Sequence, residues 1–533
     1  MAHPLEVVRD TFFSNHVDAN PEEGSTLGLR AHAGRLSDPS EAASKIELER
    51  LRGTLRALDG VDLDGLSDDA LRLDLDATLR VARFHGRYLE RDMHATNLEM
   101  AGFANGALQH AALHARSEAD HADVVARARA IPAYLDAHRK NIARGVAEGR
   151  APGKPVVTTF AERIMPGAAT STEALARAGM VPDEVAKAAS DAFGAFGRFL
   201  HDEVVAEAPP MSRLGADETA FRLRSVMGIE ASIDQLLGRA REALADAHRR
   251  MMHYAGVSKV EDAREGVMAL FAPKPATLDE ALASYRHWVG AATRLVKERA
   301  LVPVPDDLAL ELAPLPPGMA DGAGFTNWPA PLLEKEGKGH ALYSQDPNDH
   351  PKISAKQLAV HECIPGHYLQ SVVWQRRLFD QPQRAVRFLG VTDDVAGSRG
   401  YFGTMVSVEG WAVAMEYLLR EQGFFDEGPE LFFFAWCNSV HAVRVLLDLE
   451  LHAGDRTWDE LVKMVADATL LSEGWAAQQV IRSMRIPLQS STYLVGAQEI
   501  MDLRKRSDTW ILELHEALLD LGPVPISRVR LPR

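Results

Sequence analysis

At 533 residues, with 46% hydrophobic and 25% charged residues, the chain is long enough for a large buried core and has an ordinary composition for a soluble protein. Its formal net charge of −16 argues against nucleic-acid or anionic-membrane partners, because such partners require a basic surface. The cysteines are Cys363 and Cys437, so no disulfide framework is expected and the chain suits a reducing compartment.

Two further features bear on the compartment. Residues 1–6 have neither a basic region nor a long apolar core, so no signal peptide is expected. The most apolar run, 431–447, contains Asn438, His441 and Arg444 and is shorter than a bilayer span requires. The sequence therefore predicts a cytoplasmic protein with no membrane partner.

The chain divides into three parts by composition. Residues 1–300 show recurrent helical spacing of leucines and few strand signals, and they predict a helical N-terminal lobe. Residues 301–351 are crowded with proline and glycine and predict a connector that no long helix can cross. Its best strand candidate is 340–344. Residues 352–533 are again mostly helical and would form a second lobe.

The clearest chemical signal lies in residues 353–370. Ser354 and Gln357 fit a capping box, so a helix is expected to begin there. It carries His361 and Glu362 about two turns further on. In the zinc-hydrolase motif H-E-x-x-H, histidines at i and i+4 bind the ion and the glutamate is the general base.

The second histidine of this sequence, His367, is displaced to i+6. A continuous helix would turn it roughly 240° away from His361. Pro365 pushes Ile364 out of the helical conformation, however, and Gly366 can take positive φ. A kink here could return His367 to His361. An isolated His-Glu pair is more often a surface or core feature, and the later segments favour the metal interpretation.

A zinc site needs a third protein ligand. Glu409 lies among Val408, Ala412 and Met415 of a helical segment and would be partly buried. A buried carboxylate is unfavourable unless it is paired or bound to metal. Glu416, two turns further near the same face, is the second candidate. A structural salt bridge is an equally good interpretation of Glu409.

The next predicted helix, 430–452, is nearly all apolar and therefore buried. It carries Arg444, Asp448 and His452 at i, i+4 and i+8, with His441 joining them. One interpretation is an internal ion-pair ladder from Arg444 to Asp448. The other gives Asp448 the role of orienting His452 toward the reaction centre. The sequence leaves both open.

The last informative stretch, 486–504, predicts a helix that begins near Pro487 and contains Tyr493 and Arg504. A tyrosine hydroxyl can stabilise a developing oxyanion, and an arginine can clamp a carboxylate. Without other information, Tyr493 would be a core residue.

Together these segments resemble the bacterial domain of unknown function 885 family. The matching patterns are H-E-x-x-P-G-H-x-x-Q, E-G-W-A, R-x-x-x-D-x-x-x-H and Q-x-x-x-Y-x-x-G-x-x-E-I-x-x-L-R, and the early stretch 21–28 also fits. That family is distantly similar to helical zinc peptidases such as thimet oligopeptidase and angiotensin-converting enzyme. The resemblance implies a mostly α-helical, two-lobed fold with a deep cleft and at most a small β-sheet.

The resemblance also implies a site with one zinc ion per chain. The implied zinc ligands are His361, His367 and Glu409, with Glu362 as the base that activates water. The leading hypothesis is therefore a zinc-dependent peptidase of short peptides, whose extended substrate could pair with a strand at 340–344. That strand could equally be a simple connection.

Other matching positions are assigned on the same ground. Tyr493 and His452 would stabilise the tetrahedral intermediate, supported by Asp448 and Arg444. Arg504 would anchor a substrate carboxylate or only brace its helix. Two alternatives to a peptidase stay open: a metal-dependent hydrolase or lyase of a small amide or ester, and a catalytically inactive helical binding protein.

Overall fold

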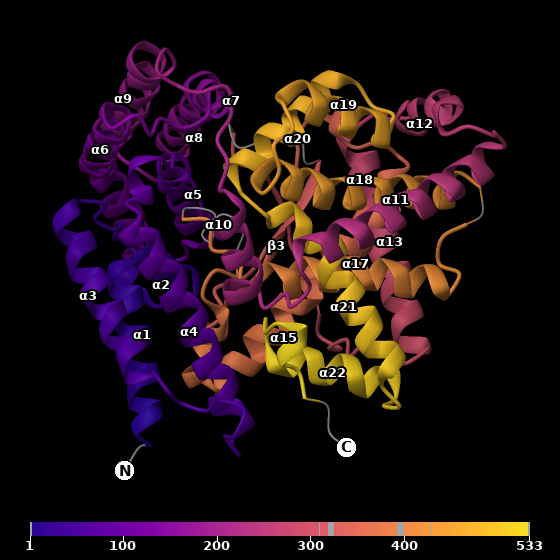
Figure 1. The fold of residues 1–533 in the computed structure, drawn as a ribbon, viewed down its shortest axis with the longest axis horizontal. Helices are drawn as coiled ribbons and strands as arrows, with labels where there is room; N and C mark the ends of the chain where they lie inside the picture. Colours follow the sequence, from indigo (N-terminus) through magenta and orange to yellow (C-terminus); the bar gives the residue numbers. More distant parts are fainter. Residues whose placement is uncertain (1–2, 309, 318–323, 392–398, 427, 531–533) are drawn as a thin grey trace.

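The computed structural model describes residues 3–308, 310–317, 324–391, 399–426 and 428–530. Within these ranges the chain is mostly helical, with one small three-stranded sheet (Figure 1). The predicted fold class, mostly α with at most a small sheet, is confirmed. The two-lobed cleft stays a prediction.

The N-terminal helices gather on the left of Figure 1. Their apolar faces pack into more than one core: one includes Leu108, Ile131 and Phe193, and another includes Phe12, Leu51 and Phe84. The elements of this part are α1 (Pro4–Ala19), α2 (Pro21–Thr26), η1 (Arg30–His32), α3 (Glu41–Ala57), α4 (Asp69–Glu90), η2 (Met93–Ala95), α5 (Glu99–His114), α6 (Glu118–Ala147), α7 (Lys154–Thr159), η3 (Phe160–Ile164), α8 (Met165–Arg177), α9 (Asp183–Phe199), η4 (Leu200–Val204), α10 (Ala216–Phe221) and η5 (Arg222–Val226).

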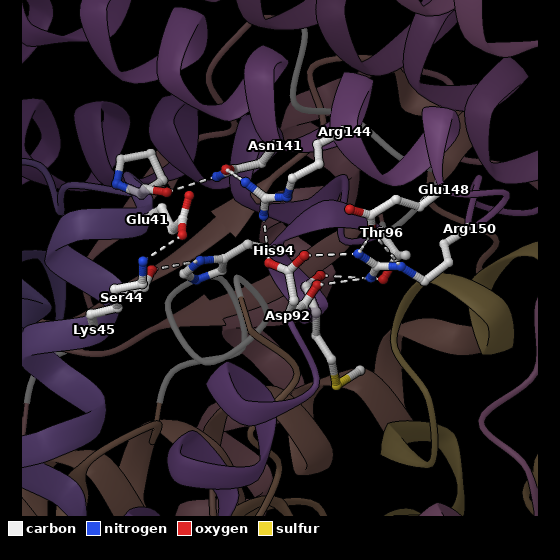
Figure 2. Close-up of polar contacts among 12 residues, drawn as sticks. Glu41, Ser44, Lys45, Asp92, His94, Thr96, Asn141, Arg144, Glu148 and Arg150 are labelled. Atoms are coloured by element: carbon white, nitrogen blue, oxygen red, sulfur yellow. Dashed lines mark hydrogen bonds and ion pairs between the residues drawn. The ribbon is translucent and has the colours of Figure 1, made fainter.

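Arginine–carboxylate contacts hold the short connection between α4 and α5 (Figure 2). Asp92, at a left-handed φ of 51°, accepts from Arg144 at 2.5 Å and from Arg150 at 2.8 Å. Ser44 of α3 lies 3.2 Å from His94 Nδ1. These contacts tie η2 to α3 and to the end of α6.

The expected lobe of residues 1–300 is not one packing unit. The next elements are α11 (Ile233–Ala255), η6 (Val260–Ala263), α12 (Arg264–Phe271) and α13 (Leu278–Glu298). Met251 and Val267 pack with Phe432 and Trp436 from the C-terminal half. Apolar periodicity reveals that a helix is buried but not which partner buries it, and the domain division at residue 300 stays a prediction.

The proline-rich connector carries three strands rather than one, β1 (Leu312–Pro314), β2 (Phe325–Trp328) and β3 (His340–Tyr343). The strand order is β1-β3-β2, with β1 parallel and β2 antiparallel to β3. The predicted strand at 340–344 therefore exists, but it is central and β2 is an edge. Because Asn327 pairs with Ala341 and Trp328 with His340, these two pairs lie on opposite faces of the sheet.

The C-terminal half is helical again. Its elements are η7 (Pro347–Asp349), α14 (Ser354–Leu358), η8 (Ala359–Cys363), α15 (His367–Asp380), η9 (Pro382–Phe388), α17 (Met405–Glu421), α18 (Pro429–His452), α19 (Trp458–Thr469), α20 (Glu473–Arg485), η10 (Gln489–Ser491), α21 (Thr492–Arg506), α22 (Ile511–Leu521) and η11 (Ile526–Arg528).

Helix α18 is longer than the apolar run suggested. By length and composition alone it could cross a membrane, but 78% of its most apolar window is buried inside the protein. Its buried residues contact both the N-terminal core and the helices α11 and α12, through Val443 and Phe432 respectively. Its apolar character is therefore accounted for by the protein core.

Candidate metal centre

The helix that carries His361 ends in a kink. Its last turn, η8, is π-helical, and Ile364 then adopts an extended conformation. The expected capping box is wrong: Ser354 instead donates to the carbonyl of Pro351 at 2.8 Å, and Ile353 precedes the helix without a side-chain cap.

Gly366 makes the kink sterically possible. Its φ is −77°, so positive φ is not the reason for a glycine here. A Cβ at this position would lie 1.8 Å from the carbonyl oxygen of His361 and 2.4 Å from that of Val360. Helix α15 then begins at His367, whose ring centroid lies 4.8 Å from that of His361.

The kink and helix α17 together bring three ligand atoms into one cluster. Oε2 of Glu409 lies 3.5 Å from Nε2 of His361 and 3.4 Å from Nε2 of His367. One ligand atom from each residue lies within 4.8 Å of the others. Glu409 is only 3% exposed. The three predicted ligands are thus adjacent.

Close packing of two helices fixes the position of Glu409. Gly410 of α17 touches Gly496 of α21, and a Cβ on Gly410 would lie 2.5 Å from the carbonyl carbon of Gly496. Only glycines permit this approach. The glycines of the two sequence patterns therefore set the distance between the helices that carry Glu409 and Tyr493.

Glu416, the second candidate for the third ligand, contacts His361 instead of joining the cluster of His361, His367 and Glu409. Its Oε1 lies 2.6 Å from Nδ1 of His361, and its Oε2 accepts from Gln357 at 2.6 Å. A carboxylate can only accept here, so Nδ1 of His361 carries the proton and Nε2 of the neutral ring keeps its lone pair for a metal. Gln357, expected to cap the helix, serves this arrangement instead.

The electrostatics of the cluster favour a cation beside Glu409. Burial alone would raise the pKa of Glu409, but the adjacent His361 and His367 outweigh it and hold that pKa well below its ordinary value. Burial would lower the pKa of His361, yet Glu409 and Glu416 outweigh it and raise that pKa.

The donor set fits a zinc ion. Oε2 of Glu409 is buried and has no hydrogen-bond partner among the described residues, and neither has Nδ1 of His367. Ligand atoms 2.0–2.1 Å from a tetrahedral zinc ion are about 3.4 Å apart, which matches the two contacts of Glu409. Its other oxygen, Oε1, accepts from Gln489 at 3.2 Å and is thereby oriented.

Glu362 lies beside the cluster and outside the ligand set. Burial raises its pKa, and a hydrogen bond from the backbone N–H of Asn327 partly opposes that effect. Oδ1 of Asn327 is buried without a partner in the described part of the chain. Strand β2 therefore borders the centre at Glu362, which no sequence pattern indicated.

Tyr493 also borders the cluster. Its ring stacks on that of His361, with centroids 6.1 Å apart, and on that of His441 at 5.5 Å. The guanidinium of Arg444 lies 5.3 Å from the centre of the same ring. His441 was noted in the sequence only as a neighbour of Arg444, yet it lies closer to the centre than His452.

The two roles considered for Asp448 are both wrong. No ion pair to Arg444 is present among the described residues, and Asp448 does not contact His452. It accepts from the backbone N–H of Ser491 at 2.9 Å, from Oγ of Ser491 at 2.7 Å and from Oγ of Ser483. Burial raises the pKa of Asp448 to about 6. Asp448 thus anchors η10, the turn that carries Gln489.

His452 is not part of the centre. Its Nδ1 accepts from the backbone N–H of Leu214 at 3.3 Å, and its Nε2 donates to the carbonyl of Ser483 at 3.0 Å. Both ring nitrogens are therefore engaged with the backbone. The expected catalytic role of His452 is replaced by a structural one.

Arg504 lies at the far end of α21. Its Nη2 donates to Glu421 at 2.7 Å, near the C-terminal end of α17. Of the two roles considered for Arg504, bracing the helices fits this contact and anchoring a substrate does not.

The fold and the cluster define a mostly helical protein with a candidate metal centre. The chain belongs to the bacterial protein family of unknown function DUF885, whose profile matches residues 21–531. No curated protein matches it.

Two solved structures are similar along the whole chain. A candidate lipoprotein of unknown function from Shewanella oneidensis has 18% identity and a TM-score of 0.72, with 99% of each chain covered. A candidate lipoprotein from Colwellia psychrerythraea has 14% identity and a TM-score of 0.73, covering 99% of this chain and 98% of that one. At these identities the likeness concerns the fold alone.

Proposed function

We propose that this protein is a zinc-dependent hydrolase that cleaves short peptides. One observation carries the proposal: Oε2 of Glu409 lies 3.4–3.5 Å from Nε2 of both His361 and His367 in a buried cluster, with Glu362, which is not one of the proposed ligands, directly beside it. A purely structural metal site would have no use for that additional carboxylate.

The residues have distinct tasks in this proposal. A bound zinc ion supplies a more acidic water and polarises the scissile carbonyl. Glu362 accepts the proton of the attacking water and delivers it to the leaving amine. Glu416 keeps His361 in the tautomer that binds the ion, and Gln489 orients Glu409. Tyr493 borders the cluster and is the candidate donor to the developing oxyanion.

Strand β2 supports a peptide over other amides. It is an edge of the sheet, and Asn327 joins it to Glu362. An extended peptide can add to such an edge through main-chain hydrogen bonds, which brings its scissile bond past the base. A small metabolite amide or ester would gain nothing from this edge.

Elemental mass spectrometry of the purified protein tests the metal site. We expect about one zinc ion per chain at this centre in wild type and its loss in His361→Ala, His367→Ala and Glu409→Ala. His201→Ala is the matched control, because His201 is exposed on η4 and distant in sequence from the centre. Wild type without metal, or His367→Ala with its metal fully retained, would contradict the proposed ligand set.

Profiling with a peptide library then tests the reaction. We expect cleavage of short peptides by wild type and far slower cleavage by Glu362→Gln that has kept its metal. Cleavage of small amides or esters without any peptide cleavage would favour the metabolite hydrolase instead. A metal-loaded protein that cleaves neither would favour the binding protein.

We propose a cytoplasmic location as well. The similar structures belong to candidate lipoproteins, whereas Cys363 and Cys437 are both buried free thiols, which suits a reducing compartment. Fractionation of the producing cells tests this: recovery in the cytosol supports it, and recovery in the membrane fraction overturns it.

A further inference from the structure

Three histidines meet beside the face of the sheet that carries His340 and Trp328. His110 and His114 are four residues apart on α5 and so share one helical face. His340 extends toward them from β3, on the face it shares with Trp328. The ring centroids of His110 and His114 are 4.5 Å apart, and those of His114 and His340 are 5.5 Å apart.

Four of the six nitrogens of these rings have no hydrogen-bond partner in the described part of the chain. Nε2 of His110, both nitrogens of His114 and Nδ1 of His340 are buried without a hydrogen bond within the described residues. Buried polar atoms are nearly always paired, so four unpaired nitrogens in one place call for a ligand.

The protonation of these rings suits a metal. Burial lowers the pKa of His110 to about 3 and that of His114 to about 2, and it also lowers the pKa of His340. The rings are therefore neutral near pH 7. Neutral imidazole is the form that binds metal ions.

The space beside the rings can accommodate an ion. A cavity of about 50 Å³ is lined by His110 and His114, together with Asp120, Asp123 and Glu334, and His340 lies outside its lining. Asp120 pairs with Arg30 at 2.6 Å, and the charge of Arg30 also acts on Glu334. A cavity of this size holds an ion with a water or two.

We propose that His110, His114 and His340 form a second site for a divalent transition-metal ion. Two imidazoles on one tetrahedral ion have ring centroids about 5 Å apart, between the two separations measured here. The nitrogens do not converge as closely as in the His361 centre, so binding requires a rotation of the rings, and the cavity beside His110 and His114 leaves room for these two to turn. Three nitrogen ligands suit zinc, cobalt, nickel or copper rather than magnesium or calcium.

This site would join α5 to β3 and does not depend on the proposed peptidase activity. The two sites use different elements: the three histidines lie on α5 and β3, whereas His361, His367 and Glu409 lie on η8, α15 and α17. The second site is therefore expected to stabilise the fold rather than to take part in hydrolysis.

The test uses Co²⁺ and the full chain with its first site disabled. His361→Ala protein, stripped of metal and titrated with Co²⁺, is expected to bind about one ion per chain, with the visible absorption of a nitrogen-ligated ion. Adding His114→Ala or, separately, His340→Gln should abolish that binding. The elevation of Tm by Co²⁺ should disappear with it, because an ion that binds only the native state stabilises that state.

His138→Asn in the same background is the matched control. His138 is also buried with both ring nitrogens unpartnered, but its ring stacks on Phe196 and meets no second histidine of this cluster. It should leave Co²⁺ binding unchanged. Absence of Co²⁺ binding by His361→Ala, or unchanged binding after His340→Gln, would overturn the proposal. Because His361 is already removed, this outcome is independent of whether the first centre is a peptidase.

Discussion

Two clusters in the described part of the molecule each bring two histidines and a glutamate within reach of one ion: His361–His367–Glu409, and a cluster of His16, Glu23 and His85. Spacing alone does not distinguish them. They differ in the residue that contacts Nδ1 of one histidine in each cluster, His361 in the first and His85 in the second. Glu416 accepts from Nδ1 of His361, whereas Arg399 lies 3.0 Å from Nδ1 of His85.

That difference favours the His361 cluster over the His16 cluster as the metal site that we propose. An arginine can only donate, so Nδ1 of His85 must accept and the proton of the neutral ring sits on Nε2, where it blocks a metal. The charge of Arg399 also opposes a second cation. At His361 the carboxylate of Glu416 has the opposite effect on both counts. The supporting group, more than the distance between ligands, therefore marks a metal site.

The second cluster is instead part of an ion-pair network. Arg399 binds both oxygens of Glu47, at 2.8 and 3.0 Å. Burial would raise the pKa of Glu47, but Arg399 outweighs it and lowers that pKa to about 2. Glu23 accepts from His16 at 3.1 Å. The network ties α1, α3 and α4 to the segment that begins at Arg399.

The largest expected contrast between the clusters is in activity. Glu362→Gln should lower kcat for peptide cleavage about 10³-fold without loss of metal, because a general base is removed. Glu23→Gln keeps a hydrogen-bonding side chain beside His16 and should leave both rate and metal content unchanged. Rate and metal content are measured on the same preparations. A Glu362→Gln enzyme with nearly wild-type kcat would show that another group is the base.

The next largest effect is on stability. Arg399→Met leaves Glu47 buried without its cation and should lower the free energy of unfolding by about 3–5 kcal/mol. Urea unfolding followed by circular dichroism measures it. The control is Glu47→Gln combined with Arg399→Met, which removes both charges and should recover much of the loss. Equal instability of the single and double variants would mean that the ion pair is not what holds this region.

Asp448 can be compared with Glu47, because it is also a buried carboxylate but accepts its hydrogen bonds from uncharged donors, Ser483 and Ser491. Its pKa is about 6 in the folded protein against an ordinary 3.8. Its contribution to stability is therefore present below pH 3.8 and lost as the pH rises through about 6, a change on the order of 3 kcal/mol.

The stability of wild type relative to Asp448→Asn should fall by that amount between pH 4 and pH 8, in urea unfolding of both proteins. Subtracting the variant removes the contributions of groups common to both. A difference that does not change with pH would indicate that Asp448 stays ionised throughout.

The smallest effect concerns Glu416. Glu416→Gln should weaken zinc binding about 10- to 100-fold while leaving one ion per chain at saturation, since it alters the partner of a ligand and not the ligand. Competition with a chromophoric chelator measures the affinity. Glu421→Gln, on the same helix but paired with the distant Arg504, is the control. Equal affinities of the two variants would remove the distinction drawn between the clusters.

The sequence predicted the helical class, a strand at β3 and the three adjacent ligands, because motifs and apolar periodicity report local structure. The sequence was a poor guide to which residues of a helix lie near the site, because residues on one helical face can be far apart along the helix axis. His452 shares a face with His441 but lies eleven residues further, about 16 Å along the axis. Arg504 likewise lies eleven residues beyond Tyr493 on α21, about 16 Å further along the helix axis.

Contacts between distant segments were also beyond the sequence. Asn327 reaches Glu362 only because β2 packs beside η8, and α11 to α13 join the C-terminal half through shared apolar surfaces. Glu416 was noticed as a carboxylate near the right face. Its task depends on a 2.6 Å contact that a pattern of residues does not encode.

The contact between Gly366 and the carbonyl of His361 has a consequence for how relatives of this chain are recognised. A change of this one glycine to alanine would leave every histidine and glutamate of the site in the sequence, yet the added methyl group could not fit without separating the two halves of the kink. A search that checks only for His361, Glu362, His367 and Glu409 would therefore count a relative with that change as having a complete site. Position 366 is therefore a sensitive marker of a degenerating copy of the gene.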